Sequence, residues 1–197
     1  MVSPGYFSIG IYCPQKSVNV GGLWRSALIL GANSIFTIGS KYSYQSSDTC
    51  HTPNNIPLVQ YKTFEDFYEH LPYGCQLVGV ENNKETSTLS KFPHALLAAY
   101  LLGSESRGLP DNILNRCHAI VKIETALAIP LNVATAGSIV MYHRYMQPQD
   151  KIPLKIKKSL SSPFRSTEKK YPSKIIAKGL ALDSLVGGIS LENNNSF

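Results

Sequence analysis

Residues 6–38, YFSIGIYCPQKSVNVGGLWRSALILGANSIFTI, decide the fold, because they follow the pattern of a strand, a helix and a second strand. Tyr6 to Tyr12 is an apolar run rich in residues that favour β-structure. Asn19 is expected to cap a helix with a buried apolar face, and Gly31 is expected to end it. Ser34 to Ile38 is the next expected strand. This order is typical of a β–α–β unit with parallel strands.

The same alternation continues outward from this unit to residue 145. It predicts an α/β fold with a mainly parallel sheet and helices on both faces. Ligands of such sheets bind beyond the carboxyl ends of the strands, so the loops after the strands are the expected site. The further elements expected are strands at Gln76–Val80, Ala95–Leu102 and Ala119–Ile123, helices at Thr63–His70, Pro110–Asn115 and Asn132–Tyr145, and a polar loop at Lys41–Ile56.

The charge of +6 is confined to one segment of the chain. Residues 151–178 carry 9 basic residues and 1 acidic residue, together with three prolines. We therefore expect a folded domain at residues 1–148 and a poorly ordered basic extension at residues 149–197. Such an arm suits RNA phosphates, and a solvated tail without a partner is the alternative. The candidate RNA-binding residues are Lys155, Lys157, Lys158, Arg165, Lys169 and Lys170.

Composition excludes several classes of protein. With 43% hydrophobic residues the chain is too apolar to be disordered as a whole. No apolar run reaches the roughly 20 residues of a membrane-spanning helix, and the first residues lack a secretory signal, so a cytoplasmic protein is expected. The 4 cysteines have no C-x-x-C spacing, which predicts free thiols and no metal site. The glycine-rich loops of dinucleotide and P-loop sites are also absent.

Three segments follow predicted strands: NVGGLWR (Asn19–Arg25), LLGSESRGLP (Leu101–Pro110) and IPLNVATAGSIVMYHR (Ile129–Arg144). Together they resemble, in order and spacing, the three motifs of the SpoU or TrmH-like branch of the SPOUT RNA methyltransferases. The third segment departs from the family pattern, with Pro130 and Ala134 where the family has serines and Glu124 where proline is common. The matching positions are Asn19, Gly21 and Arg25 for N-x-G-x-x-x-R, and Gly103, Glu105, Gly108 and Leu109 for G-x-E-x-x-G-L.

The resemblance implies transfer of a methyl group from S-adenosylmethionine to a ribose 2′-oxygen of RNA, without a metal. It also implies a deep C-terminal trefoil knot and a homodimer with the active site at the subunit interface. A guanidinium is too weak a base at neutral pH, so we expect Arg25 to hold a phosphate and stabilise developing negative charge. The implied catalytic residues are Arg25, Asn19, Glu105 and Asn132. The implied cofactor-binding residues are Val80, Gly103, Ile123 and Leu131, largely through their backbone.

Several alternatives stay open. The first motif begins at residue 19, as in minimal single-domain members, so tRNA is the expected substrate and rRNA the alternative. The lost serines favour a catalytically silent knotted RNA-binding protein, while base methylation and another nucleotide-dependent α/β enzyme are further options. Asn132 could serve only as a helix cap. The small residues Ala134, Ala136 and Gly137 are expected to permit close helix approach in the dimer.

Overall fold

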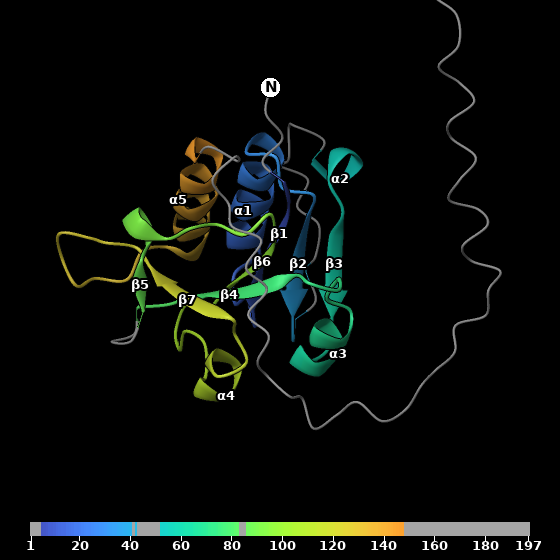
Figure 1. The fold of residues 1–197 in the computed structure, drawn as a ribbon. Helices are drawn as coiled ribbons and strands as arrows, with labels where there is room; N and C mark the ends of the chain where they lie inside the picture. Colours follow the sequence, from blue (N-terminus) through green and yellow to red (C-terminus); the bar gives the residue numbers. More distant parts are fainter. Residues whose placement is uncertain (1–4, 41, 43–51, 83–85, 148–197) are drawn as a thin grey trace, which may run out of the picture. The chain divides into compact units, whose positions relative to one another are not determined.

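The computed structural model describes residues 5–40, 42, 52–82 and 86–147. Within them, seven parallel strands form one sheet in the order β3-β2-β1-β6-β4-β7-β5 (Figure 1). The extension expected at residues 149–197, with its six RNA-binding candidates, lies outside the described residues, so its role and the domain boundary stay predictions. The strands are β1 (Tyr6–Tyr12), β2 (Ser34–Ile38), β3 (Leu58–Tyr61), β4 (Gln76–Val80), β5 (Ser87–Thr88), β6 (Leu97–Leu102) and β7 (Ala119–Lys122). The helices are α1 (Ser17–Ile29), α2 (Thr52–Asn55), α3 (Phe64–Glu69), the 3₁₀ helix η1 (Leu89–Lys91), α4 (Asp111–Leu114) and α5 (Val133–Met146).

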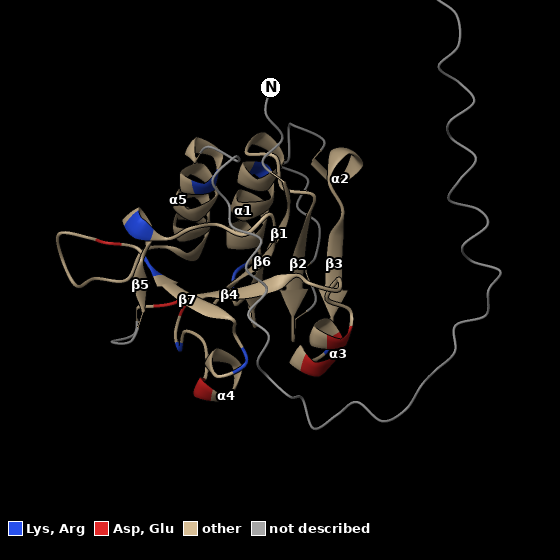
Figure 2. Ribbon diagram, in the orientation of Figure 1, with Lys and Arg blue, Asp and Glu red and all other residues tan. Residues whose placement is uncertain are grey.

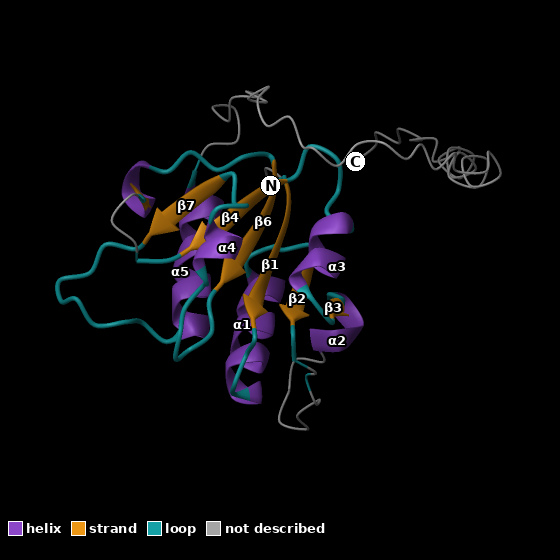
Figure 3. Ribbon diagram, turned by 90° about the horizontal axis from the view of Figure 1, so that it is seen from below, coloured by secondary structure: helices purple, strands orange, loops and turns teal. Residues whose placement is uncertain are grey.

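Each face of the sheet builds its own core, because successive strand residues point to opposite sides. Phe7, Ile9 and Ile11 of β1 pack with residues of α1 and α5. Phe36 and Ile38 of β2 pack with residues of α3 and α4. Figures 1 and 3 show the two pairs of helices on opposite faces of the sheet. The predicted α/β class, the parallel sheet and the helices on both faces are confirmed.

The first helix starts earlier than the sequence indicates. Its N-cap is Lys16, so the prediction that Asn19 caps α1 is wrong. Asn19 lies inside the helix and is buried, at 6% exposed, because its amide bonds to other loops rather than to its own backbone. The predicted end is confirmed: Gly31 has φ +81°, and the next N–H, of Ala32, donates to the carbonyl of Ala27 at 2.9 Å.

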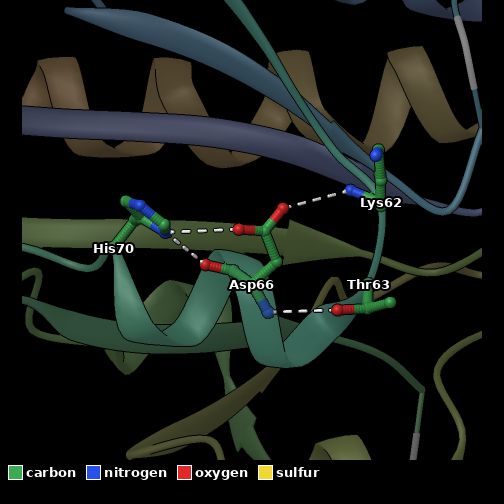
Figure 4. Close-up of polar contacts among 4 residues, drawn as sticks. All are labelled: Lys62, Thr63, Asp66 and His70. Atoms are coloured by element: carbon green, nitrogen blue, oxygen red, sulfur yellow. Dashed lines mark hydrogen bonds and ion pairs between the residues drawn. The ribbon is translucent and has the colours of Figure 1, made fainter.

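Short elements account for most other differences between prediction and structure. The helix predicted at Thr63–His70 is α3, and Figure 4 shows its N-terminus closed by reciprocal bonds. The N–H of Asp66 donates to Thr63 Oγ1 at 3.1 Å, and the Asp66 carboxylate accepts the N–H of Lys62 at 3.3 Å. The sequence analysis missed β3, β5, α2 and η1. Each has 2 to 4 residues, which is too short to show a periodic pattern.

The small residues of α5 pack against α1 and the core of the same chain, and their role in a dimer stays a prediction. A Cβ on Gly137 would lie 2.4 Å from Leu23 Cδ1 of α1, so glycine lets the two helices approach closely. The Ala134 Cβ lies 3.5 Å from the position that a Cβ on Gly22 would take. Ala136 also packs against the chain's own core. The exposed face of α5 instead carries large side chains, Tyr142, Tyr145 and Met146.

Candidate functional site

The site lies at the carboxyl edge of the sheet, where β1 and β6 are neighbours. The chain leaves β1 toward α1 on one face and leaves β6 toward α4 on the other. Open α/β sheets bind their ligands where loops diverge in this way, beyond the carboxyl ends of the strands. Cys13 begins the first loop in the left-handed region, at φ +46°, with its N–H bonded to the carbonyl of Ile38 at 2.7 Å.

Three polar side chains, one from each motif, form a continuous chain of hydrogen bonds at this edge. Asn19 Nδ2 donates to Glu105 Oε1 at 2.6 Å. Asn132 Nδ2 donates to Asn19 Oδ1 at 3.0 Å. We call Glu105, Asn19 and Asn132 the polar triad. The structure therefore brings together three of the four residues implied to be catalytic.

The N-terminus of α5 fixes which atoms donate and which accept in the polar triad. Asn132 is the N-cap of that helix, and its Oδ1 accepts the N–H of Ala134 at 2.9 Å and of Thr135 at 3.3 Å. Its Nδ2 must then face outward, toward the oxygen of Asn19. Asn132 thus caps the helix and joins the triad at once.

Glu105 is kept ionised by the groups around it. Its burial alone would raise its pKa, but the amide of Asn19 and the backbone N–H groups of Glu105, Gln15 and Lys16 outweigh burial and hold the pKa below its ordinary value. Gln15 N–H donates to Glu105 Oε2 at 3.1 Å, and Gln15 Nε2 donates to Ser106 Oγ at 2.6 Å. The loop after β1 and the loop after β6 are therefore tied together at the carboxylate. Sequence reasoning missed Gln15, whose only signal is its place after the first strand.

The second motif folds back on itself, and its glycines make that fold possible. Ser104 and Gly108 exchange two backbone hydrogen bonds, of 3.2 and 3.0 Å. A Cβ on Gly103 would lie 2.3 Å from the carbonyl carbon of Gly108, and Gly108 itself has φ +63°. The turn between them presents Glu105 to Asn19. This contact gives Gly103 a structural purpose apart from the cofactor role implied for it.

The implied cofactor-binding residues follow three neighbouring strands. Val80 ends β4, Gly103 follows β6 and Ile123 follows β7, and the strand order places these backbones along one edge. Leu131 ends the loop that extends from β7 to α5 (Figures 1 and 3), where it is 38% exposed. Leu127 and Ile129 of this loop are more exposed still. Exposed apolar side chains beside the carboxyl ends of strands are a surface that fits an adenosine group.

Glu124, which departs from the family pattern, has a defined place in the structure. Its carboxylate accepts a hydrogen bond from Ser90 Oγ and another from the Ser90 N–H at 3.4 Å. The hydroxyl of Ser90 lowers the pKa of Glu124 below its ordinary value. The start of the β7–α5 loop is thereby tied to η1 by a side chain.

Arg25, the fourth implied catalytic residue, stays apart from the polar triad. It is exposed on α1, and within the described part of the chain it has no hydrogen bond or ion pair. Six residues separate it from Asn19, and that spacing turns it about 240° around the helix, away from Asn19. Arg25 falls instead on a stripe of exposed residues with Val18, Gly22 and Ile29.

No group of three metal-binding side chains lies together among the described residues. Cys13, Cys75 and Cys117 have free thiols, as the sequence predicts for them. Burial raises the pKa of Cys75 and of Cys117 to about 11. None of the helices in the described ranges is long and apolar enough to cross a membrane.

Comparison with known proteins identifies the class that this fold and site define. Residues 6–142 match the model of the SpoU rRNA Methylase family, and the chain belongs to that family. The sequence is 24% identical over 136 residues to the mouse (Mus musculus) tRNA (guanosine(18)-2′-O)-methyltransferase TARBP1. That match covers 65% of this chain and 8% of TARBP1, so the chain corresponds to a small part of that protein.

Two solved structures show the same fold. One, described as giving structural insights into the 2-OH methylation of C/U34 on tRNA, is 26% identical with a TM-score of 0.63, covering 72% of this chain and 95% of that one. The other is the SpoU methyltransferase AviRb from Streptomyces viridochromogenes in complex with AdoMet. It is 21% identical with a TM-score of 0.61, covering 73% of this chain and 61% of that one.

Proposed function

We propose that the protein transfers a methyl group from S-adenosylmethionine to a ribose 2′-hydroxyl of RNA. The polar triad carries this proposal, because it joins one residue from each of the three motifs at the carboxyl ends of β1 and β6. A bond network of this kind holds the loops of a site in one arrangement before substrate arrives. The names of TARBP1 and of the C/U34 structure support the 2′-oxygen as the acceptor.

The charge of Glu105 fits a positively charged cofactor. S-adenosylmethionine, when bound, carries its methyl group on a cationic sulfur that becomes neutral as the methyl leaves. Glu105 stays a carboxylate because hydrogen bonds lower its pKa. A carboxylate with a lowered pKa is a weak base, so its role is to orient and to offset charge rather than to take the 2′-hydroxyl proton. Backbone at Val80, Gly103, Ile123 and Leu131 would hold the cofactor.

Arg25 completes the site through a homodimer. The exposed stripe of α1 that contains Arg25 also carries Val18 (63% exposed) and Ile29 (68% exposed). Val18 and Ile29 are the apolar side chains that a second copy would cover there. A second copy packed on this stripe would bring Arg25 to the edge of a neighbouring site, where it would hold the phosphate beside the target ribose. The trefoil knot stays a prediction from the resemblance.

RNA is the substrate that the surface charge supports. Lys16 and Arg107 lie in the two loops that hold Glu105, are exposed, and have no acidic partner among residues 5–40, 42, 52–82 and 86–147. Glu65, Asp66 and Glu69 lie on α3 and Asp111 lies on α4, away from Lys16 at the start of α1 (Figure 2). The names of TARBP1 and of the C/U34 structure both mention tRNA, which supports tRNA rather than rRNA as the proposed target. The basic extension would add further phosphate contacts.

Methyl transfer by the full chain tests this function. Wild type and Asn19→Ala would be incubated with labelled S-adenosylmethionine and with separate tRNA and rRNA fractions. We expect wild type to label tRNA, and Asn19→Ala to lose most of that transfer while still folding. Asn55→Ala, a substitution in α2 outside the polar triad, is the control. Label in neither RNA, with cofactor bound, would favour a catalytically silent RNA-binding protein.

A further inference from the structure

Glu81 follows β4 and carries a carboxylate. It belongs neither to the polar triad nor to the residues proposed to hold the cofactor. It is half-buried, and none of the ion pairs formed by the described residues includes it. Placing a carboxylate partly out of water costs free energy unless hydrogen-bond donors compensate. The donors that compensate here are backbone N–H groups.

Both oxygens of Glu81 are occupied by backbone. Oε2 accepts the N–H of Leu109 at 2.8 Å, and Oε1 accepts the N–H of Asn82 at 3.0 Å. The N–H of Glu81 itself donates to the carbonyl of Val121 at 3.0 Å, which extends the pairing of β4 with β7. Glu81 therefore connects the rigid edge of the sheet to the second motif. Bonds from N–H groups to a carboxylate are shorter and stronger than neutral ones.

The second motif is shaped to receive this carboxylate. A Cβ on Gly108 would lie 2.4 Å from Glu81 Oε2, so a larger residue at this position would displace the carboxylate, and the φ of +63° at Gly108 itself favours glycine. Gly108 closes the turn with Ser104, and Glu105 lies within that turn. A displacement of the Gly108–Leu109 peptide would move Glu105 relative to Asn19.

We propose that Glu81 is a positioning residue for methyl transfer, which fixes the Ser104–Gly108 turn and, through it, Glu105 of the polar triad. This inference rests on the proposed function of the site. Glu81 acts through Leu109 and Gly108 and contacts neither Asn19 nor Asn132. Its effect belongs to the rate of the chemical step rather than to the binding of RNA.

Two substitutions separate positioning from a general effect on folding. Glu81→Ala removes both acceptor oxygens, whereas Glu81→Gln keeps one oxygen that accepts the Leu109 N–H. The control is Glu69→Gln, because Glu69 is an exposed carboxylate on α3. Thermal unfolding, hydrogen exchange of the Leu109 amide, cofactor affinity, and kcat and KM for RNA would be measured for each full-length variant.

We expect Glu81→Ala to speed exchange of the Leu109 amide at least tenfold and to lower kcat at least tenfold, with KM for RNA within twofold of wild type. Glu81→Gln should restore kcat to within about threefold. Unchanged exchange at Leu109, unchanged kcat, or equal loss in Glu81→Gln and Glu81→Ala would overturn the assignment. A wild type that transfers no methyl group to RNA would instead overturn the proposed function, and the exchange measurement distinguishes that case.

Discussion

The amide of Asn132 donates a hydrogen bond of 3.0 Å to the amide oxygen of Asn19, across 113 positions of sequence. The bond links the first turn of α5 to the interior of α1, and through Asn19 it reaches Glu105. Asn132 directly follows Leu131, one of the residues assigned to the cofactor, whereas Glu105 lies beside the loop after β1. One line of side chains thus extends from the loop before α5 to the loops after β1 and β6.

Substitution of Asn132 separates its two roles. Asn132→Ser keeps an oxygen that caps α5 but is too short to reach Asn19, so we expect stability near wild type and methyl transfer reduced at least tenfold. Asn132→Ala also loses the cap and should cost about 1 kcal/mol of unfolding free energy. Urea denaturation and single-turnover transfer measure the two effects. Full activity in Asn132→Ser would reduce Asn132 to a helix cap.

Glu105→Gln tests the carboxylate of the polar triad. The substitution places an amide where backbone N–H groups of Gln15 and Lys16 donate, and it removes the negative charge. Hydrogen bonds to a charged group are worth about 1.5–3 kcal/mol, so we expect the rate of transfer to fall roughly 10- to 100-fold.

The pKa of Glu105 in the wild type predicts how the wild-type and Glu105→Gln rates compare as the pH changes. Hydrogen bonds to the carboxylate overcome the effect of burial and hold this pKa below its ordinary value, so Glu105 stays charged throughout the neutral range. Wild-type and Glu105→Gln rates should therefore differ by a constant factor from pH 6 to pH 9. A wild-type rate that falls with a pKa near 7, a fall absent in Glu105→Gln, would assign Glu105 a base role instead.

Binding of RNA should weaken with salt through the loops around Glu105. Lys16→Gln and Arg107→Gln should each lower affinity for tRNA and reduce the slope of log K against log salt by about 1. Arg116→Gln is the matched control, because Arg116 lies 4.0 Å from the ring centre of Tyr68 and 3.7 Å from the Glu65 carboxylate. Fluorescence anisotropy at several salt concentrations measures the slopes. Equal slopes in all three variants would remove Lys16 and Arg107 from the RNA surface.

Acid should destabilise the protein through His94. This side chain is fully buried, with Nδ1 2.5 Å from the Tyr100 hydroxyl and Nε2 2.8 Å from His143 Nδ1. Burial, together with the charges of Arg144 and His143, lowers the pKa of His94 to about 3. The unfolded chain takes up a proton near pH 6.5, so between about pH 6.5 and pH 3 it binds more protons than the folded chain.

The free energy of unfolding should therefore fall with acid across that window, by up to about 1.4 kcal/mol per pH unit from His94. His94→Gln should flatten this dependence, while His70→Gln, on an exposed histidine of the α3 C-cap, should leave it in place. Urea denaturation at pH 7, 6, 5 and 4 measures both. The same steep dependence in both variants would contradict the role of His94.

The sequence was sufficient for the parts of the fold that have strong local signals. The runs at Tyr6–Tyr12, Ser34–Ile38 and Gln76–Val80 are strands with the predicted bounds, because each is an apolar segment between turn residues. Asn132 caps α5 as its position before an apolar helix suggests. The strand order, with β6 between β1 and β4, depends on contacts between distant residues and could not be read locally.

The motifs predict which residues belong to the site, but they do not predict the hydrogen bonds between those residues. Asn19, Glu105 and Asn132 were found from the resemblance, but their mutual bonds appear only in the folded chain. Asparagine near a helix start is usually a cap, which is why the sequence predicts that Asn19 caps α1. In the structure Lys16 is the cap, and the Asn19 side chain bonds to Glu105 and Asn132 instead. Glu81 carries no local signal, because its partner Leu109 is 28 positions away.

The central claim is that methyl transfer ends on a ribose oxygen of RNA. The measurement that tests it most directly is mass spectrometry of nucleosides from tRNA treated with S-adenosylmethionine and either wild type or Arg25→Ala. The account predicts one 2′-O-methylated nucleoside with wild type and its loss with Arg25→Ala. A methyl group on a base, or no methylated product from a protein that binds both cofactor and tRNA, would contradict it.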